Sequence, residues 1–105
     1  MKKGDLLQVQ FPFTNQRELK RRPALVLAAE APDVTVAFIT GNLALAQPHD
    51  VVLQPTTLNR LGKPLLVRVL KIATLAPALL HGRLGELTSA ELALVDAGLR
   101  LGLGL

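Results

Sequence analysis

Apolar and polar residues alternate over several short segments of this chain, a pattern typical of β-strands with one buried face. Asp5–Phe11 and Leu65–Leu70 alternate in this way, with Leu7 and Val9 on the apolar side of the first. Ala24–Ala29 is a nearly continuous apolar run, as expected for a central strand. The β-branched segment that follows is expected to pair with it as a hairpin. That β-branched segment is Val34–Thr40. The other predicted strands are Asp50–Leu53, Lys71–Leu75 past a bend, and a short strand or turn at 82–87.

The end of the chain predicts one α-helix. Thr88-Ser-Ala-Glu91 has the spacing of a capping box, in which each of the two outer side chains accepts a hydrogen bond from the backbone amide of the other residue. Gly102 is expected to end the helix. A single helical turn is also expected within residues 54–64. This order of elements favours a mainly β fold with one helix, a small antiparallel barrel in a single domain spanning residues 1–105.

Composition excludes several kinds of chemistry. The chain has 105 residues and no cysteine, which removes disulfides and thiolate sites. His49 and His81 are not spaced as a metal motif, and the carboxylates are dispersed, so we expect no metal and no cofactor. No apolar run approaches the roughly 20 residues of a membrane helix, and no signal peptide is evident, so a soluble, cytoplasmic protein is expected. The net charge of +4 and pI of about 10.1 favour polyanionic partners.

A group of basic residues precedes the second predicted strand. Its members are Arg17, Lys20, Arg21 and Arg22, with Glu18 as the only counter-charge among them. A guanidinium is a poor general base, but it binds phosphate through two parallel hydrogen bonds and stabilises charge during phosphoryl transfer. Pro23 biases Arg22 toward an extended backbone at the start of a rigid strand. The alternative interpretation is a solvated run of charge ahead of a strand.

Thr40 is a lone hydroxyl residue at the end of the third predicted strand. If the second and third strands form a hairpin, Arg22 and Thr40 lie at the same edge of the sheet. A hydroxyl at that position could donate to a phosphate oxygen or position an attacking 2′-OH. Alternatively, Thr40 is there only because β-branched residues suit strands.

Several short motifs recur in the order found in one family of proteins. They are Lys3-Gly4-Asp5, Phe11-Pro12-Phe13-Thr14, Arg21-Arg22-Pro23-Ala24-Leu25-Val26-Leu27, Phe38-Ile39-Thr40-Gly41-Asn42-Leu43, Asp50-Val51-Val52-Leu53, Val67-Arg68-Val69 and Leu84-Gly85-Glu86-Leu87. On this ordered set the chain resembles the MazF/PemK toxins of bacterial type II toxin–antitoxin systems, which are small sequence-selective endoribonucleases.

The resemblance implies an SH3-like barrel that acts as a homodimer and cleaves single-stranded mRNA without a metal or a ribosome, leaving a 2′,3′-cyclic phosphate and a 5′-OH. It implies that Arg22 and Thr40 are the catalytic residues. It also implies an antitoxin whose flexible acidic tail covers the RNA groove. The residues expected to bind RNA are Arg17, Lys20, Arg21, Gly41 and Asn42, with Glu18 and His49 as supporting candidates. Gly41 departs from the family, because many relatives carry Ser or Thr there.

Three other functions stay open from the sequence. The chain could be a basic barrel that binds nucleic acid without cutting it, or a related toxin that poisons a protein such as DNA gyrase. It could also be a degenerate toxin with Gly41 as its lesion. The gyrase-poisoning relatives do not need the Arg-Pro pair and the strand-end threonine, so Arg22 and Thr40 favour the nuclease.

Overall fold

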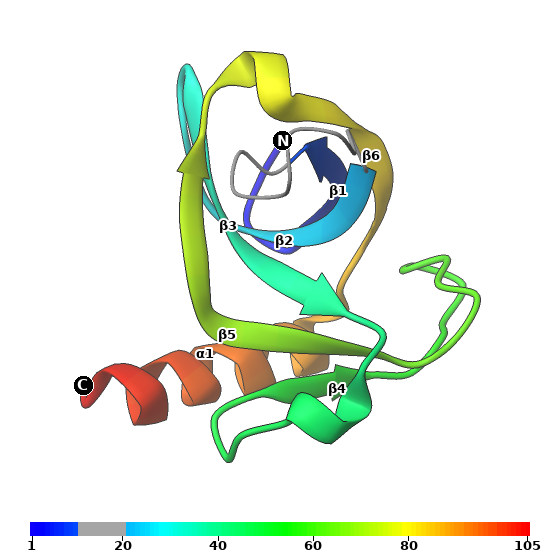
Figure 1. The fold of residues 1–105 in the computed structure, drawn as a ribbon, viewed down its shortest axis with the longest axis vertical. Helices are drawn as coiled ribbons and strands as arrows, with labels where there is room; N and C mark the ends of the chain where they lie inside the picture. The colour runs from blue at the N-terminus through cyan, green and yellow to red at the C-terminus, as the bar shows by residue number, and fades with distance from the viewer. Residues whose placement is uncertain (11–20) are drawn as a thin grey trace.

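The computed structural model describes residues 1–10 and 21–105, which form an antiparallel sheet and a C-terminal helix (Figure 1). The strands are β1 (Asp5–Gln10), β2 (Arg21–Glu30), β3 (Asp33–Thr40), β4 (Val51–Leu53), β5 (Leu65–Leu75) and β6 (Leu80–Glu86). The helix α1 spans Ser89–Leu103, and two short 3₁₀ helices, η1 (Leu43–Leu45) and η2 (Pro77–Leu79), lie in connections. The expected mainly β fold with a terminal helix is therefore confirmed.

The six strands are ordered β4-β5-β3-β2-β1-β6 in one sheet, and every neighbouring pair is antiparallel. The sheet curls strongly, with β2 bent into an arc between β3 and β1 (Figure 1). In the described part of the chain no ladder joins β4 to β6, so the sheet has two edges. The expected barrel is thus an approximate description, because the sheet is curled and its hydrogen bonding is not closed.

The sheet is buried on both faces, which the alternating pattern of β1 did not indicate. Leu7 and Val9 pack in one apolar cluster with residues of β2 and β3, as expected. Leu6, on the opposite face of β1, is also fully buried, in a second cluster that includes Val95 of α1. The curl encloses the first cluster and α1 covers the second, so the sheet separates two small cores.

β5 is one continuous strand of 11 residues. The sequence predicts a bend before Lys71, and the register of β5 against β3 shifts in this region, because Phe38 pairs with Arg68 whereas Ala37 pairs with Ile72. In the predicted turn at 54–64, the Arg60 backbone amide donates to the Thr56 carbonyl at 3.0 Å, which closes one turn, but no helix is formed there.

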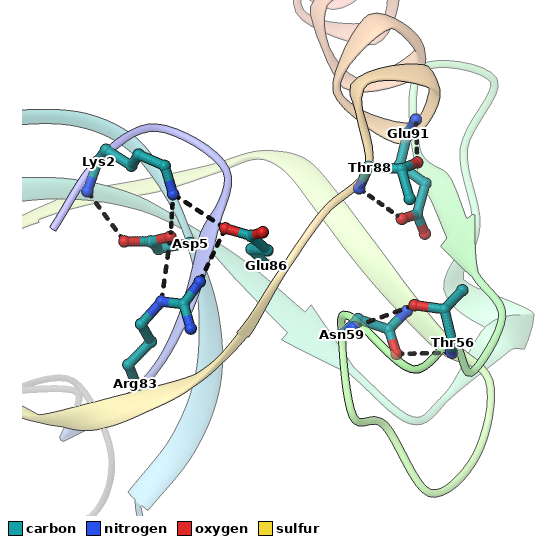
Figure 2. A network of polar contacts seen from close by, with 8 residues as sticks. All are labelled: Lys2, Asp5, Thr56, Asn59, Arg83, Glu86, Thr88 and Glu91. Atoms are coloured by element: carbon teal, nitrogen blue, oxygen red, sulfur yellow. Dashed lines mark hydrogen bonds and ion pairs between the residues drawn. The ribbon is translucent and has the colours of Figure 1, made fainter.

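The capping box of α1 is present as predicted. The Thr88 hydroxyl accepts from the Glu91 amide at 3.1 Å, and the Glu91 carboxylate accepts from the Thr88 amide at 2.9 Å (Figure 2). The predicted end at Gly102 is wrong, because the helix continues to Leu103 and Gly104 takes the left-handed cap conformation. A Cβ on Gly102 would lie 3.0 Å from the Leu70 side chain, so this glycine allows close packing of α1 on β5.

No helix among the residues that the structure describes is both long and apolar enough to span a membrane.

Candidate functional site

β2 and β3 part at the point where both predicted catalytic residues lie. The last residue pair of the ladder between these two strands, toward the start of β2, is Ala24 with Phe38. Beyond it, Arg22 pairs with Val9 of β1, whereas Thr40 pairs with Leu66 of β5. Arg22 and Thr40 each lie two residues from the last pair, so strand alternation puts both side chains on the same face of the sheet. The structure therefore places them at one end of the sheet, on either side of the opening between β2 and β3.

The Thr40 hydroxyl has a hydrogen atom available for a ligand. Its oxygen accepts a hydrogen bond from the Asn42 backbone amide at 3.2 Å. A hydroxyl carries one donor and two acceptor sites, and the Asn42 contact uses an acceptor site. The side chain is thus held in place by the following turn while its O–H can still donate to a phosphate oxygen.

Arg21 and Arg22 supply positive charge on the other side of this opening. Both are exposed, and neither forms an ion pair with any residue in 1–10 or 21–105. Pro23 follows in the ladder opposite Gln8, so the backbone that carries Arg22 is part of the sheet. A guanidinium in this position has all its donors available for an anion.

Three of the predicted residues lie outside the described part of the chain, namely Arg17, Glu18 and Lys20. Gly41 and Asn42 are exposed and follow Thr40 directly. The Asn42 side-chain oxygen accepts from the Ala44 amide at 3.2 Å and caps η1, so the oxygen has a structural role and the NH₂ group takes no part in the cap.

His49 is not placed with Arg22 and Thr40. The residue lines a groove of about 350 Å³ between residues 48–52 and α1, and its backbone carbonyl is in close contact with the position that a Cβ on Gly98 would take. The His49 Nε2 lies 3.6 Å from Asp50 Oδ1. Val51, two residues after His49, is in the core cluster under α1. The His49 backbone therefore contacts α1, whereas its imidazole lies beside the Asp50 carboxylate.

Asp50 and Arg68 form an ion pair on the face that carries Thr40, which the sequence did not predict. The Arg68 Nε lies 3.1 Å from Asp50 Oδ2, and the Asp50 side chain is 0% exposed. Arg68 pairs with Phe38, and Thr40 pairs with Leu66. The two pairs are two residues apart along each strand, so their side chains are on the same face of the sheet. The Asp50 carboxylate also accepts from the backbone amides of Gln47 and Val69, each at 3.0 Å.

Asp50 thus fixes the end of the loop at 41–49 to β5. The start of this loop is fixed to the same strand by the pairing of Thr40, at the end of β3, with Leu66. From the sequence, Asp50 is expected only to begin a strand. The available signal was the position of Arg68 inside an otherwise apolar strand, because a charge there needs a partner.

A second ion-pair network lies at the other end of the sheet and ties the N-terminus to β6 (Figure 2). Burial of Asp5 would raise its pKa, but hydrogen bonds from the Lys2 amide and ammonium and from Arg83 outweigh burial, and the net pKa is lowered. Hydrogen bonds to Glu86 and Asp5 raise the pKa of Lys2, and the bond from Lys2 lowers the pKa of Glu86. The network is a structural clasp, remote from Thr40 in the sheet.

Within residues 1–10 and 21–105, no three His, Cys, Asp or Glu side chains are grouped so that they could hold a metal ion.

The model of the PemK-like, MazF-like toxins of type II toxin–antitoxin systems matches residues 2–103. The chain belongs to this family. A search of curated protein sequences found no match.

Solved structures of the MazF/PemK family have the same fold. An endoribonuclease in complex with its cognate antitoxin, from a mycobacterial species, has a TM-score of 0.80 at 23% identity, over 100% of this chain and 96% of that one. The Mycobacterium tuberculosis toxin MazF-mt6 has a TM-score of 0.79 at 22% identity, over 96% and 97% of the two chains. MazF from Deinococcus radiodurans has a TM-score of 0.76 at 25% identity, over 100% and 97%.

Proposed function

We propose that this chain is the toxin of a type II toxin–antitoxin system and cleaves single-stranded mRNA at selected sequences, without a metal and without the ribosome. The observation that carries the proposal is the placement of Arg22 and Thr40 on one face at the opening between β2 and β3. Membership of the toxin family supports it. So do the mycobacterial neighbours that are described as endoribonucleases.

In the proposed reaction the RNA 2′-oxygen attacks the adjacent phosphorus and the 5′-oxygen leaves. One P–O bond forms and one breaks, and the proton of the 2′-OH is lost while the leaving oxygen gains one. The products are a 2′,3′-cyclic phosphate and a 5′-OH. Arg22 binds two phosphate oxygens and stabilises the charge of the pentacoordinate phosphate, and the Thr40 O–H donates to a phosphate oxygen and orients it.

Other basic residues are proposed to bind the rest of the RNA strand. Arg17, Lys20 and Arg21 hold flanking phosphates, and the loops at 14–21 and 41–49 select the bases. The partners proposed beside RNA are a cognate antitoxin with a flexible acidic tail, which suits the same basic rim, and a second copy of this chain. The protein is proposed to act in the cytoplasm.

The test is cleavage of a long RNA in EDTA, with primer extension to locate the cuts and analysis of the ends for cyclic phosphate. Arg22→Ala and Thr40→Ala should each lower the cleavage rate by about 10²–10³, the usual cost of removing one well-placed donor. Arg22→Lys should also be impaired, because it keeps the charge but lacks the planar fork. Arg100→Ala, an exposed arginine on α1, is the control for loss of charge.

Unaltered cleavage by Arg22→Ala would reject the catalytic assignment. Binding of RNA without any fragments would favour the non-catalytic barrel. A protein that neither binds nor cuts RNA but is toxic on expression would favour a protein target.

A further inference from the structure

Lys63 lies beside the predicted RNA-binding residue Gly41, although the two are far apart in the sequence. A Cβ on Gly41 would lie 3.2 Å from the Lys63 Nζ and 3.5 Å from its Cε. The same Cβ would lie 3.8 Å from the Leu65 side chain, at the first position of β5. The Lys63 side chain therefore lies against Gly41, and its ammonium group is close to the backbone directly after Thr40.

The backbone of Gly41 does not explain why this position is glycine. The glycines with positive φ in the described part of the chain are Gly4, Gly82 and Gly104. The conformation of Gly41 is thus open to other residues, and what a side chain there would meet is the end of Lys63. The glycine therefore leaves room for the Lys63 side chain.

Lys63 is also a cation without a counter-ion in the described part of the chain. Lys2, Lys3 and Arg68 each form an ion pair with a carboxylate. Lys63 is exposed and forms none with the carboxylates of the described segments. An ammonium that has three donors and no anionic partner can bind a phosphate.

Strand alternation decides which phosphate Lys63 can reach. Thr40 pairs with Leu66, so its side chain is on one face of the sheet, whereas Leu65 belongs to the cluster on the opposite face. Gly41 lies against Leu65 and Lys63, so the ammonium is at the rim on the far side of the backbone from the Thr40 hydroxyl. The ammonium is thus next to the residue that follows Thr40 but not on the Thr40 face of the sheet, so the phosphate it would contact is a neighbour of the one at Thr40 and not the same one.

We propose that Lys63 binds the RNA phosphate that flanks the cleaved one, in the space left open by Gly41. The proposal rests on the proposed function, because the reacting phosphate is taken to lie at Arg22 and Thr40. Lys63 contributes to holding the strand and takes no part in the chemical step.

The experiment compares Lys63→Ala with Lys71→Ala, which removes the same charge from an exposed position further along β5. One measurement is binding of a short RNA whose 2′-OH groups are methylated, so that it cannot be cut, over a range of salt concentrations. The other is kcat and KM for the unmodified RNA. Circular dichroism melts check that each variant is folded.

Lys63→Ala should weaken binding about fivefold, which corresponds to an exposed ion pair of about 1 kcal/mol. The slope of log affinity against log salt should fall by about 0.7, the value for one lost phosphate contact on a single strand. KM should rise and kcat should stay unchanged. Lys63→Arg should bind nearly as well as the natural chain, and Lys71→Ala should match the natural chain in affinity and slope.

A Lys63→Ala variant with unchanged affinity and slope, or with no larger effect than Lys71→Ala, would overturn the proposal, and Lys63 would be an ordinary solvated lysine. A fall in kcat at constant KM would overturn it as well, since it would place Lys63 in the chemical step. Failure of the proposed function is seen separately. If the natural chain binds the methylated RNA but cuts no RNA, the nuclease proposal fails while the binding assay still tests Lys63.

Discussion

Asp50→Asn should be among the most destabilising isosteric substitutions in this protein. The carboxylate is fully covered and has three contacts of hydrogen-bonding length, with the amides of Gln47 and Val69 and with the Arg68 Nε. Every one of these partners is a donor. Asparagine has one acceptor oxygen and one NH₂ group. The NH₂ group would point at other hydrogen-bond donors and could not bond to them.

The cost follows from what is lost. If the asparagine oxygen keeps the Val69 amide, its NH₂ group faces the Gln47 amide and the Arg68 guanidinium. Losing one ordinary hydrogen bond costs about 1 kcal/mol and losing a charged one about 1.5–3 kcal/mol. The Arg68 side chain, only 21% exposed, is also left without its counter-charge. We expect Asp50→Asn to lower the free energy of unfolding by about 3–4 kcal/mol, within the range for breaking a buried pair.

The assay is urea unfolding of Asp50→Asn, Arg68→Met and the double variant, with thermal melts alongside. For a domain of this size about 3–4 kcal/mol corresponds to a fall in Tm of roughly 15–20 °C. The double variant should be about 2 kcal/mol more stable than the sum of the single effects predicts, because the two side chains are in direct contact. Asp33→Asn, an exposed aspartate at the start of β3, is the control and should change stability by less than about 0.5 kcal/mol.

A loss below 1 kcal/mol for Asp50→Asn, or additive effects in the double variant, would refute this reasoning. Either result would mean that the ion pair makes no net contribution and that the loop end is held by other contacts.

Two further predictions concern other parts of the molecule. The pKa of Asp5 is lowered below its ordinary value of 3.8, so the contribution of Asp5 to stability should be complete above that pH and fall as acid protonates the folded form. Asp5→Asn should accordingly flatten the acid limb of a plot of stability against pH. Asn59 is fully buried and accepts from the Thr56 and Leu61 amides at 2.8 and 3.0 Å (Figure 2 shows its contacts with Thr56). Asn59→Ala should lower stability by about 2–3 kcal/mol in urea unfolding, and a loss below about 1 kcal/mol would show that these hydrogen bonds do not stabilise the turn.

The strands could be predicted because most are short and strongly apolar, and the helix start because the capping box is local. The end of the helix could not, since Gly102 looks like a terminator until its contact with Leu70 is known. The same limit applies to the site. Arg22 and Thr40 were predicted from a hairpin, which joins neighbours in sequence, and their catalytic role stays a prediction.

Asp50 and Arg68 were missed because their contact depends on the strand order. β4 lies next to β5, on the far side of β5 from β3, and no local pattern in the sequence specifies that placement. Lys63 was missed for a related reason, since its position depends on the path of the turn between β4 and β5. Contacts set by such crossovers are visible only once the sheet is assembled.

The two ends of the loop at 41–49 are anchored on β5 only two positions apart. Thr40 pairs with Leu66, and Asp50 contacts Arg68 and the amide of Val69. A loop whose ends are fixed to one rigid strand tolerates insertions and substitutions between them. The proposed function assigns base selection to this segment, so replacing its sequence should change the target preference without moving the threonine at its base.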